Sequence, residues 1–429
     1  MKFNLDNEII KKYLLKGGFG LEKESLRVDE NGYLCHTLHP FLNNPYIDRD
    51  FCENQVELIT DPCASVEEAY RDLAIIHRET VKSLYTMESG KEFLWPFSNP
   101  PYVKGEKDIP VASFQGELKN KEFYRQYLAS KYGKKKMLFS GIHINYSFSL
   151  ELLKEDYKNR DFKSFQDYKN YIYLQLAKKI VKYSWFIVYL TAASPILDGS
   201  FFNDQELGKT VDRNLGSARC SEIGYWNNFI PILDYSHLNG YIDSIQKYVD
   251  NGQLKETSEL YYPVRLKPKG INNINNLKEK GVNHIELRMI DLNPFSPINF
   301  VKEDLEFIHL FIIYLMSLDE EEFDEIQQIW AIRNEKEAAK YDDEHIDIEI
   351  AKDQYVNVRE LSLNILSDME KYFSLFQDSR HFEMIEYQKN KIINHQRYVE
   401  RIKKEFSDNY VILGVKKAEE YAKKICKGE

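Results

Sequence analysis

Residues 283–290 constrain the fold more than any other stretch of the chain. Apolar and polar residues alternate through this segment, with Ile285 and Leu287 on one side and Glu286 and Arg288 on the other. Alternation with a period of two is typical of a β-strand that has one apolar face. Two prolines follow closely and predict a turn, because proline withdraws a backbone donor and fixes the chain. The sequence therefore predicts a strand that presents an acid and a base on its polar face.

Three earlier segments show the same alternation. Their polar faces would carry Glu22 and Glu24 (residues 20–28), Glu53, Gln55 and Glu57 (residues 50–60), and His143 and Asn145 (residues 141–148). An antiparallel sheet can pack one face against helices and leave the other face open. If the four strands are neighbours, the open face gathers as many as five carboxylates, one imidazole and one guanidinium.

Such a cluster points to a metal site. Carboxylates that lie close together repel one another unless cations neutralise them. Hard oxygen ligands suit Mg²⁺ or Mn²⁺, above all where substrate phosphates complete the coordination. The alternative is that these side chains form charged faces of edge strands in water, and the pattern alone leaves both interpretations open.

The remaining chain is predicted to be largely helical. Helical patterns cover residues 5–15, 65–87, 117–132, 164–193, 301–318, 354–377, 380–406 and 413–426. The Ser65-Val66-Glu67-Glu68 sequence is typical of a capped helix start. The glycine-rich residues 17–20 are interpreted as a turn, because no phosphate-binding glycine motif surrounds them. Residues 196–240 are irregular, and a long irregular segment of this kind is often a functional loop.

Composition narrows the class of partner. With 68 acidic and 58 basic side chains the formal net charge is −10, which argues against nucleic acid as a partner. The five cysteines are scattered without a CxxC pair, which favours reduced thiols and a cytoplasmic location. The N-terminal residues do not resemble a signal peptide. The most apolar run, residues 185–193, is too short to span a bilayer, so no membrane association is expected.

Six motifs together resemble those of bacterial glutamate–cysteine ligase (γ-glutamylcysteine synthetase), and they occur in that family's order. They are GLEKESLRV at 20–28, DFCENQVELIT at 50–60, LWPFSNP at 94–100, FSGIHINYS at 139–147, ELYYPVR at 259–265 and IELRMIDLNPFSPI at 285–298. The last motif is the most specific. The resemblance covers residues 20 to about 300, and the helical C-terminal region cannot be matched motif by motif.

The resemblance implies an α+β fold similar to the catalytic domain of glutamine synthetase. A curved, mostly antiparallel sheet would form an open funnel with helices outside. Residues 1–429 would form a single catalytic unit, in which residues 1–300 carry the motif-bearing sheet and loops and residues 301–429 form a helical C-terminal part. No stretch resembles the ATP-grasp module of bifunctional glutathione synthases, so only the first step of glutathione biosynthesis is implied.

The family reaction is the ATP-dependent ligation of the γ-carboxylate of L-glutamate to the amine of L-cysteine through γ-glutamyl phosphate. Carried over by motif position, the metal shell for Mg²⁺ or Mn²⁺ comprises Glu22, Glu24, Glu53, Glu57, His143 and Glu286, with Asp50 beside it. By the same resemblance, Arg288 and Arg219 would contact phosphate or a substrate carboxylate. Both anions match the planar fork of a guanidinium group. Phe51, Tyr225 and Tyr261 resemble walls of the acceptor pocket, although packing in the core is an equal alternative.

Two alternatives remain at this level. The loop around Arg219 matches the family loosely, so the acceptor could be an amine other than cysteine. A non-catalytic nucleotide- or amino-acid-binding homologue is disfavoured, because all the acidic positions and Arg288 are present. The sequence leaves open the number of metal ions, glutathione feedback, redox regulation and the oligomeric state, for which a monomer is the simplest assumption.

Overall fold

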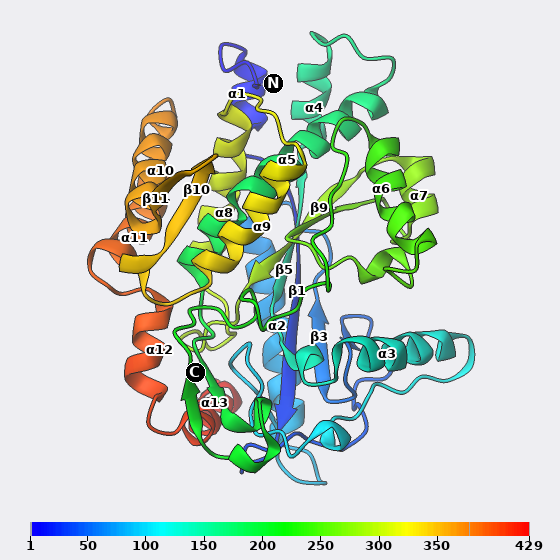
Figure 1. Cartoon of the computed structure of the whole chain (residues 1–429), viewed down its shortest axis with the longest axis vertical. Helices are drawn as coiled ribbons and strands as arrows, with labels where there is room; N and C mark the ends of the chain where they lie inside the picture. Colours follow the sequence, from blue (N-terminus) through cyan, green and yellow to red (C-terminus); the bar gives the residue numbers. More distant parts are fainter. Residues whose placement is uncertain (1, 377, 429) are drawn as a thin grey trace.

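An antiparallel sheet forms the centre of the molecule (Figure 1). The structure is a computed structural model and describes residues 2–376 and 378–428. Within these residues the main sheet runs in the order β2 (Ile47–Arg49), β3 (Gln55–Ile59), β1 (Gly17–Val28), β5 (Ile142–Phe148), β9 (His284–Ile290) and β8 (Val264–Lys267), and β4 (Phe93–Leu94) pairs with β1. Every pairing is antiparallel. The strands predicted from alternation are therefore direct neighbours.

Helices cover one face of this sheet. α2 (Val66–Tyr85), α5 (Phe165–Thr191) and α8 (Lys302–Ser317) all contact it or one another. Phe19 on β1 meets the ring of His309 on α8 edge-on, with 4.9 Å between the ring centroids. The buried Lys23 on the same strand reaches the His77 ring on α2. Odd-numbered residues of β1 thus point toward the helices, and Glu22 and Glu24 point to the opposite side.

The other elements surround this core. They are α1 (Glu8–Tyr13), α3 (Lys119–Tyr132), α4 (Leu150–Tyr157), α6 (Leu238–Asp250), α7 (Ile274–Lys280), α9 (Glu325–Ala338), α10 (Val358–Phe373), α11 (Ser379–Ile393), α12 (Tyr398–Phe406), α13 (Tyr410–Lys427) and the hairpins β6 (Ile196–Asp198) with β7 (Thr210–Asp212) and β10 (Asp347–Ala351) with β11 (Gln354–Asn357). The predicted α+β class, with helices outside an antiparallel sheet, is confirmed.

Most predicted helices are confirmed to within a few residues. At the start of α2 the Ser65 hydroxyl accepts a hydrogen bond from the Glu68 backbone at 3.2 Å, and the Glu68 carboxylate accepts one from Ala64 at 3.0 Å. Both bonds satisfy backbone donors that lack partners within the helix. The capping sequence therefore located this helix start correctly.

The predicted turn at residues 17–20 is wrong, because β1 already begins at Gly17. A Cβ atom on Gly17 would lie only 2.6 Å from the Ser147 carbonyl oxygen, and one on Gly18 would lie 2.6 Å from the Ser147 hydroxyl. The glycines thus permit a close approach between β1 and β5 rather than a reversal of the chain.

The helical C-terminal part also needs correction. The predicted helix 380–406 is two helices, α11 and α12, separated near His395, whose φ of 50° ends a right-handed helix. The predicted helix 354–377 begins only at Val358, because residues 354–357 form a strand of the β10–β11 hairpin. Residues 301–429 are therefore mainly helical but contain this small sheet.

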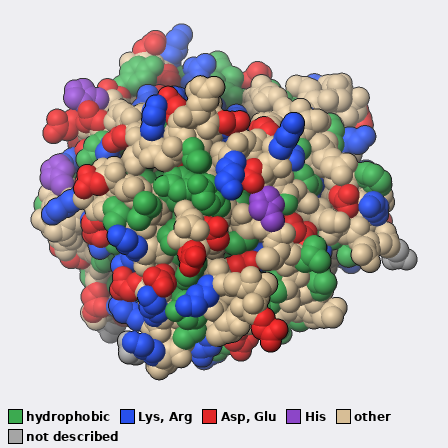
Figure 2. Space-filling view, turned by 90° about the horizontal axis from the view of Figure 1, so that it is seen from below, with side chains coloured by type: hydrophobic (Ala, Val, Ile, Leu, Met, Phe, Trp, Pro, Cys, Tyr) green, Lys and Arg blue, Asp and Glu red, His purple; other side chains and the backbone are tan. Residues whose placement is uncertain are grey.

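The surface carries charges of both signs. On the face shown in Figure 2, basic and acidic side chains are interspersed, and neither sign forms a continuous stripe. Among the described residues no helix is both long and apolar enough to cross a membrane.

Candidate active site

Strand register brings the polar faces together on the side of the sheet away from α2. Glu22 on β1 lies directly opposite His143 on β5, and Glu24 lies opposite Glu57 on β3. Side chains opposite one another in an antiparallel pair lie about 5 Å apart at their Cβ atoms. On the other side of β5, Asn145 pairs with Glu286 of β9. Four adjacent strands thus contribute to one cluster.

A β-bulge shapes the centre of this face. β5 pairs Ile142 with Ile290 and Ile144 with Leu287, so two residues of β9, Arg288 and Met289, lie opposite the lone His143. A bulge changes the direction in which its side chains point and is common beside active sites. Here Arg288 lines the main cavity, and Met289 lines a smaller one behind it.

The main cavity has a volume of about 210 Å³. Eleven of the twelve residues predicted for the site line it: Glu22, Glu24, Asp50, Phe51, Glu57, His143, Arg219, Tyr225, Tyr261, Glu286 and Arg288. They come from β1, β3, β5, β9 and the loops between elements. Residues up to 266 positions apart in the sequence (Glu22 and Arg288) therefore meet in one cavity.

His143 lies at the centre of the carboxylates. Its Nδ1 is 3.3 Å from Glu22 Oε2 and 3.7 Å from Glu286 Oε1, and its Nε2 is 3.6 Å from Glu24 Oε1. Burial, together with the Arg288 charge, lowers the pKa of His143 to about 4. The imidazole is therefore neutral at pH 7, and a neutral imidazole nitrogen is free to bind a metal ion.

Two carboxyl groups beside His143 have raised pKa values. Burial and the Asp50 charge raise the pKa of Glu24 to about 8. Burial and the Glu22 charge raise the pKa of Glu57 well above its ordinary value. One ligand atom each of Glu22, Glu57 and His143 lies within 4.8 Å of the others. An oxygen-rich set whose carboxyl groups hinder one another's ionisation fits a hard divalent cation, so these residues fit the metal that the resemblance implies.

The opposite end of the cluster already holds cations. Glu286 lies 3.1 Å from an Arg288 nitrogen and 3.0 Å from Lys267 Nζ. Although burial alone would raise it, these two cations hold the pKa of Glu286 well below its ordinary value. The cavity is thus acidic at the Glu24–Glu57 end and basic at the Lys267–Arg288 end.

Arg219 reaches the cavity from the irregular segment between α5 and α6. One guanidinium nitrogen donates to the Arg288 carbonyl at 2.6 Å. The guanidinium passes over Gly141, where an added Cβ atom would lie 2.4 Å from its central carbon. The absent side chain at Gly141 is therefore what lets Arg219 lie against the sheet. The prediction that residues 196–240 contain a site loop is consistent with this placement.

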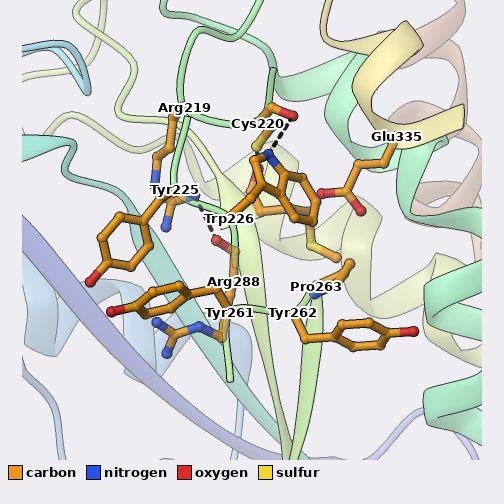
Figure 3. A pocket seen from close by; sticks show the side chains of 10 residues that line it. Arg219, Cys220, Tyr225, Trp226, Tyr261, Tyr262, Pro263, Arg288 and Glu335 are labelled. Atoms are coloured by element: carbon orange, nitrogen blue, oxygen red, sulfur yellow. Dashed lines mark hydrogen bonds between the residues drawn. The ribbon is translucent and has the colours of Figure 1, made fainter. Parts of the chain in front are cut away.

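Aromatic rings form one wall of the site. The rings of Tyr225 and Tyr261 lie 4.1 Å apart between centroids, and Tyr132 packs edge-on against Tyr261 at 5.4 Å. Phe51 is buried and lines the main cavity. Figure 3 shows Tyr225 and Tyr261 beside Arg219 and Arg288. The sequence left core packing and a place in the cavity wall as alternatives for these rings. In the structure the rings do both: they pack against the core and line the cavity.

The prediction for Glu53 is wrong. Residues 53 and 54 form a turn before β3, so the strand alternation does not extend to Glu53. Glu53 does not line the cavity, and its carboxylate accepts hydrogen bonds from the backbone of His39 and Ser113, both at 3.0 Å, and from Arg49 at 3.2 Å. These bonds, and the Arg49 charge, keep its pKa below the ordinary value despite burial. Glu53 ties loops together rather than joining the acidic cluster.

Three basic residues of the cavity were not predicted. Arg265 and Lys267 lie on β8, where they alternate with buried Val264 and Leu266, so the period-two pattern could have found them. Arg125 lies on α3 and donates to the Asp50 carbonyl. No local pattern marks Arg125, because its helix has no clear apolar face to show which side is inward.

The chain is similar to known proteins over most of its length. The family model described as glutamate-cysteine ligase matches residues 3–255 and 250–339. The chain belongs to the glutamate–cysteine ligase family. The resemblance seen in the sequence motifs is therefore confirmed, and it extends beyond residue 300 into α9.

Curated relatives include bifunctional proteins. The chain is 36% identical over 411 residues to the glutathione biosynthesis bifunctional protein of Listeria innocua, covering 92% of this chain and 52% of that protein. It is 34% identical over 443 residues to the corresponding protein of Clostridium perfringens, covering 97% and 55% respectively. The chain thus spans about half the length of the curated relatives it matches.

Solved structures agree on the fold. A bifunctional glutathione synthetase from Pasteurella multocida superposes with a TM-score of 0.85 at 26% identity, over 99% of this chain and 55% of that one. A glutamate–cysteine ligase from Francisella tularensis, solved in complex with AMP, superposes with a TM-score of 0.84 at 22% identity, over 96% and 89%. Both support the mixed fold of helices and antiparallel sheet described above.

Proposed function

We propose that this protein ligates the γ-carboxylate of L-glutamate to the amine of L-cysteine at the expense of ATP, through γ-glutamyl phosphate, as the first step of glutathione biosynthesis. The observation that carries this proposal is the two-ended cavity of a chain in the glutamate–cysteine ligase family. Four carboxyl groups and a neutral imidazole lie at one end, and guanidinium and ammonium groups, two of them paired with Glu286, lie at the other. This is the distribution of charge that a phosphoryl transfer between two anions needs.

The acidic end would hold Mg²⁺ (or Mn²⁺). Glu22, Glu24, Glu57, His143 and Glu286 are the proposed ligands, with Asp50 beside them. The bound cation would neutralise negative charge on the phosphates of ATP, the co-substrate. The raised pKa values of Glu24 and Glu57 support this assignment. At Glu24, burial and the Asp50 charge outweigh the attraction of Arg219 and Arg288, and at Glu57 burial and the Glu22 charge dominate.

The basic end would hold the anions that react. The Arg219 guanidinium is held by the Arg288 backbone carbonyl, and the Arg288 guanidinium is held separately by Glu286 at 3.1 Å. A guanidinium offers a planar pair of donors that matches a carboxylate or a phosphate. We assign Arg288 and Arg219 to the transferred phosphoryl group and the substrate carboxylate, and Lys267 to the same anionic region. Phosphoryl transfer depends on positioning and charge, so no protein nucleophile is required.

Phe51, Tyr225 and Tyr261 would enclose the acceptor amine. Their rings give the wall beside Arg219 and Arg288 an apolar surface, which suits a small side chain such as that of cysteine. Tyr261 is held from behind by Tyr132, whose hydroxyl donates to Glu259 at 2.7 Å. The wall is therefore rigid, and a rigid wall selects by size.

The finer description of the fold belongs to the same proposal. We infer that the sheet forms an open funnel of the glutamine-synthetase type, with the cavity at its mouth, and that residues 1–429 act as a single catalytic unit. The partners are small molecules, without nucleic acid or membrane, and a monomer suffices for the site because all its residues lie on one chain. The scattered, unpaired cysteines fit a cytoplasmic location.

The test is ADP release in the presence of ATP, Mg²⁺ and L-glutamate across a panel of acceptors: L-cysteine, L-2-aminobutyrate, glycine, L-alanine and ammonia. We expect cysteine and 2-aminobutyrate to stimulate turnover most, since the pocket would select a small side chain. A Glu286→Gln variant should lose about 100-fold or more of this activity, because removing one charge from a catalytic cluster costs several kcal/mol. Glu383→Gln, an exposed position on α11, is the matched control.

The outcomes separate the alternatives. If another amine stimulates turnover best, the phosphoryl-transfer assignment stands and the acceptor assignment falls. If no amine stimulates ADP release by well-folded protein, the protein is a binding homologue rather than a ligase. If Glu286→Gln keeps full activity and the same Mg²⁺ dependence, the cavity described above is not the active site.

A further inference from the structure

A second, smaller chamber adjoins the main cavity. It has a volume of about 40 Å³ and shares four lining residues with the main cavity: Arg219, Tyr225, Tyr261 and Arg288. Its other walls come from the segment 220–226, the residues before β8, and α9 (Figure 3). A cavity needs roughly 10–15 Å³ to hold one water molecule, so this chamber has room for a short chain of waters.

Glu335 points into this chamber from α9 (Figure 3). Its side chain is buried, with 2% of the residue exposed, and its Oε2 atom has no hydrogen-bond partner among the described residues. The Ser184 hydroxyl on α5 lies against the same carboxyl group. A buried carboxyl oxygen without a partner is costly, and it is normally satisfied by water or by a ligand.

The groups around Glu335 are mixed in character. Arg219 and Arg288 line the chamber on the side of the main cavity, and Lys336 is its neighbour on α9. The uncharged side chains of Cys220, Tyr225, Tyr261 and Tyr262 complete the ionisable groups of the chamber. Burial raises the pKa of Glu335 to about 7, while Ser184 and the Arg219 charge act to lower it. The group can therefore gain or lose a proton close to neutral pH.

The proposed reaction needs a proton acceptor. An amino acid carries an ammonium group at neutral pH, and an ammonium nitrogen has no lone pair with which to attack an acyl phosphate. The carboxyl groups that line the two cavities are Glu22, Glu24, Asp50, Glu57, Glu286 and Glu335, as far as the described residues show. All except Glu335 belong to the acidic cluster assigned to the metal, where a bound cation would make them poor bases.

We propose that Glu335 accepts the ammonium proton of the acceptor amine, through water held in the small chamber. This inference rests on the proposed function and adds a proton acceptor to it. The proton leaves the ammonium nitrogen for the Glu335 carboxylate, and the nitrogen lone pair then forms the C–N bond to the γ-carbonyl carbon. The bond between that carbon and the phosphate oxygen breaks, inorganic phosphate leaves, and the remaining extra proton on the new amide nitrogen passes to the departing phosphate.

The test compares wild type with Glu335→Gln, which keeps the shape of the side chain but cannot take up a proton. L-2-Aminobutyrate serves as acceptor because it has no thiol to titrate. At neutral pH we expect a loss of about 10²-fold in acceptor-dependent turnover, the lower range for general base catalysis. In the variant the rate should climb about tenfold per pH unit with the fraction of free amine, whereas wild type should level off above a pH of about 7.

Hydroxylamine provides the decisive acceptor, since its nitrogen is largely unprotonated at neutral pH and needs no base. The variant should use hydroxylamine within a few-fold of the wild-type rate, a rescue that a merely structural defect would not show. Glu337→Gln, a partly exposed position two residues along the same helix, is the control and should match wild type with both acceptors.

Three results would overturn the inference. One is a Glu335→Gln variant whose pH profile with 2-aminobutyrate equals that of wild type, and another is an equal loss with hydroxylamine. The third is a wild type that no acceptor stimulates, which would overturn the proposed function as well. If Glu335→Gln does not fold, Glu335→Asp decides instead. This substitution shortens the side chain and changes the pKa of its carboxyl group. The rise of the rate with pH on the acidic side of the pH–rate profile should therefore shift. A rise that does not shift contradicts the inference.

Discussion

Glu53 and Glu57 are four positions apart, yet the structure gives them different tasks. Glu57 faces the cavity among like charges, whereas Glu53 accepts hydrogen bonds from two backbone amides and Arg49. We expect Glu57→Gln to lose about 100-fold or more of Mg²⁺-dependent ADP release, with an unchanged or higher melting temperature because repulsion is relieved. Glu53→Gln should keep the Mg²⁺ dependence and lose about 1–3 kcal/mol of stability, since charge-assisted bonds are weakened.

Thermal unfolding and Mg²⁺ titrations of ADP release on both variants test this contrast. Each variant serves as the control for the other, because the substitution is the same. The assignment fails if Glu53→Gln abolishes turnover while Glu57→Gln leaves it intact.

The same pair shows how far residue-level patterns reach. Alternation predicted the inward faces of β1, β5 and β9 correctly, because one face of each strand must meet the helices. It failed at Glu53, since a turn precedes β3 there and the side chain is held by the backbone of His39 and Ser113, which lie outside the strand segment. Glu335 was not predicted, because no local sequence pattern distinguishes a buried carboxyl group on a helix from an exposed one.

If Glu24 is a metal ligand as proposed, metal binding should depend on pH. Burial and the Asp50 charge raise its pKa to about 8 from an ordinary value of 4.5, so it is protonated at pH 7 without metal. Mg²⁺ must displace this proton, and its affinity should therefore rise with pH by up to about tenfold per unit until about pH 8. Without metal the folded state binds the proton more tightly than the unfolded chain, so this group favours folding at low pH, and that contribution declines as pH rises from 4.5 to about 8.

Calorimetric titration of Mg²⁺ in buffers with different ionisation enthalpies measures the released proton directly. Melting temperatures across the same pH range, with and without Mg²⁺, check the sign of the stability change. A Mg²⁺ affinity that stays constant between about pH 6 and about pH 8 would contradict the assignment of Glu24 as a ligand.

At the level of elements, Gly141, the residue just before β5, and the loop that follows α5 fit together because Gly141 has no side chain. The Arg219 guanidinium lies over Gly141, and it also donates to the Arg288 carbonyl on β9. We expect Gly141→Ala to push Arg219 away from the sheet, since the new Cβ atom would lie 2.4 Å from its central carbon. The expected result is a rise of about tenfold or more in the KM of the substrate that Arg219 binds, with a small change in melting temperature.

Steady-state kinetics for ATP, glutamate and the acceptor in turn would show which substrate that is. Gly20→Ala is a suitable control, because a Cβ atom there would meet Asn145 only at an ordinary 3.4 Å. Equal kinetics for Gly141→Ala and wild type would mean that Arg219 does not depend on this contact.

The prediction of a turn at residues 17–20 also failed because of glycine. Gly17 and Gly18 read as a break, whereas they allow β1 to approach β5 closely at Ser147. The two situations look alike in one sequence, because glycine serves both in turns and in close packing. The partner strand lies more than 120 residues away, so local reasoning could not decide between them.

At the scale of the whole molecule, the C-terminal helices complete the packing of the sheet-bearing part. On α13, Tyr410 packs edge-on against Trp95 with 5.5 Å between centroids and donates to the Asn99 carbonyl at 3.1 Å. One continuous cluster of buried hydrophobic residues includes members of both parts. The motifs end near residue 300, but the hydrophobic cluster continues into the C-terminal helices. The role of residues 301–429 could therefore not be predicted from the motifs alone.

This continuity predicts that residues 1–300 and 301–429 unfold together. Tyr410→Ala removes a fully buried aromatic ring and should cost about 3–5 kcal/mol, lowering the melting temperature of the entire protein in one step. Tyr355→Ala, at an exposed position on β11, should leave it unchanged. Tryptophan fluorescence, which includes buried Trp95, and far-ultraviolet circular dichroism, which reports mainly helices, should then give coincident transitions for wild type and both variants. Two separated transitions, with only the helical one shifted by Tyr410→Ala, would show instead that the sheet-bearing part is stable without the helices that follow it.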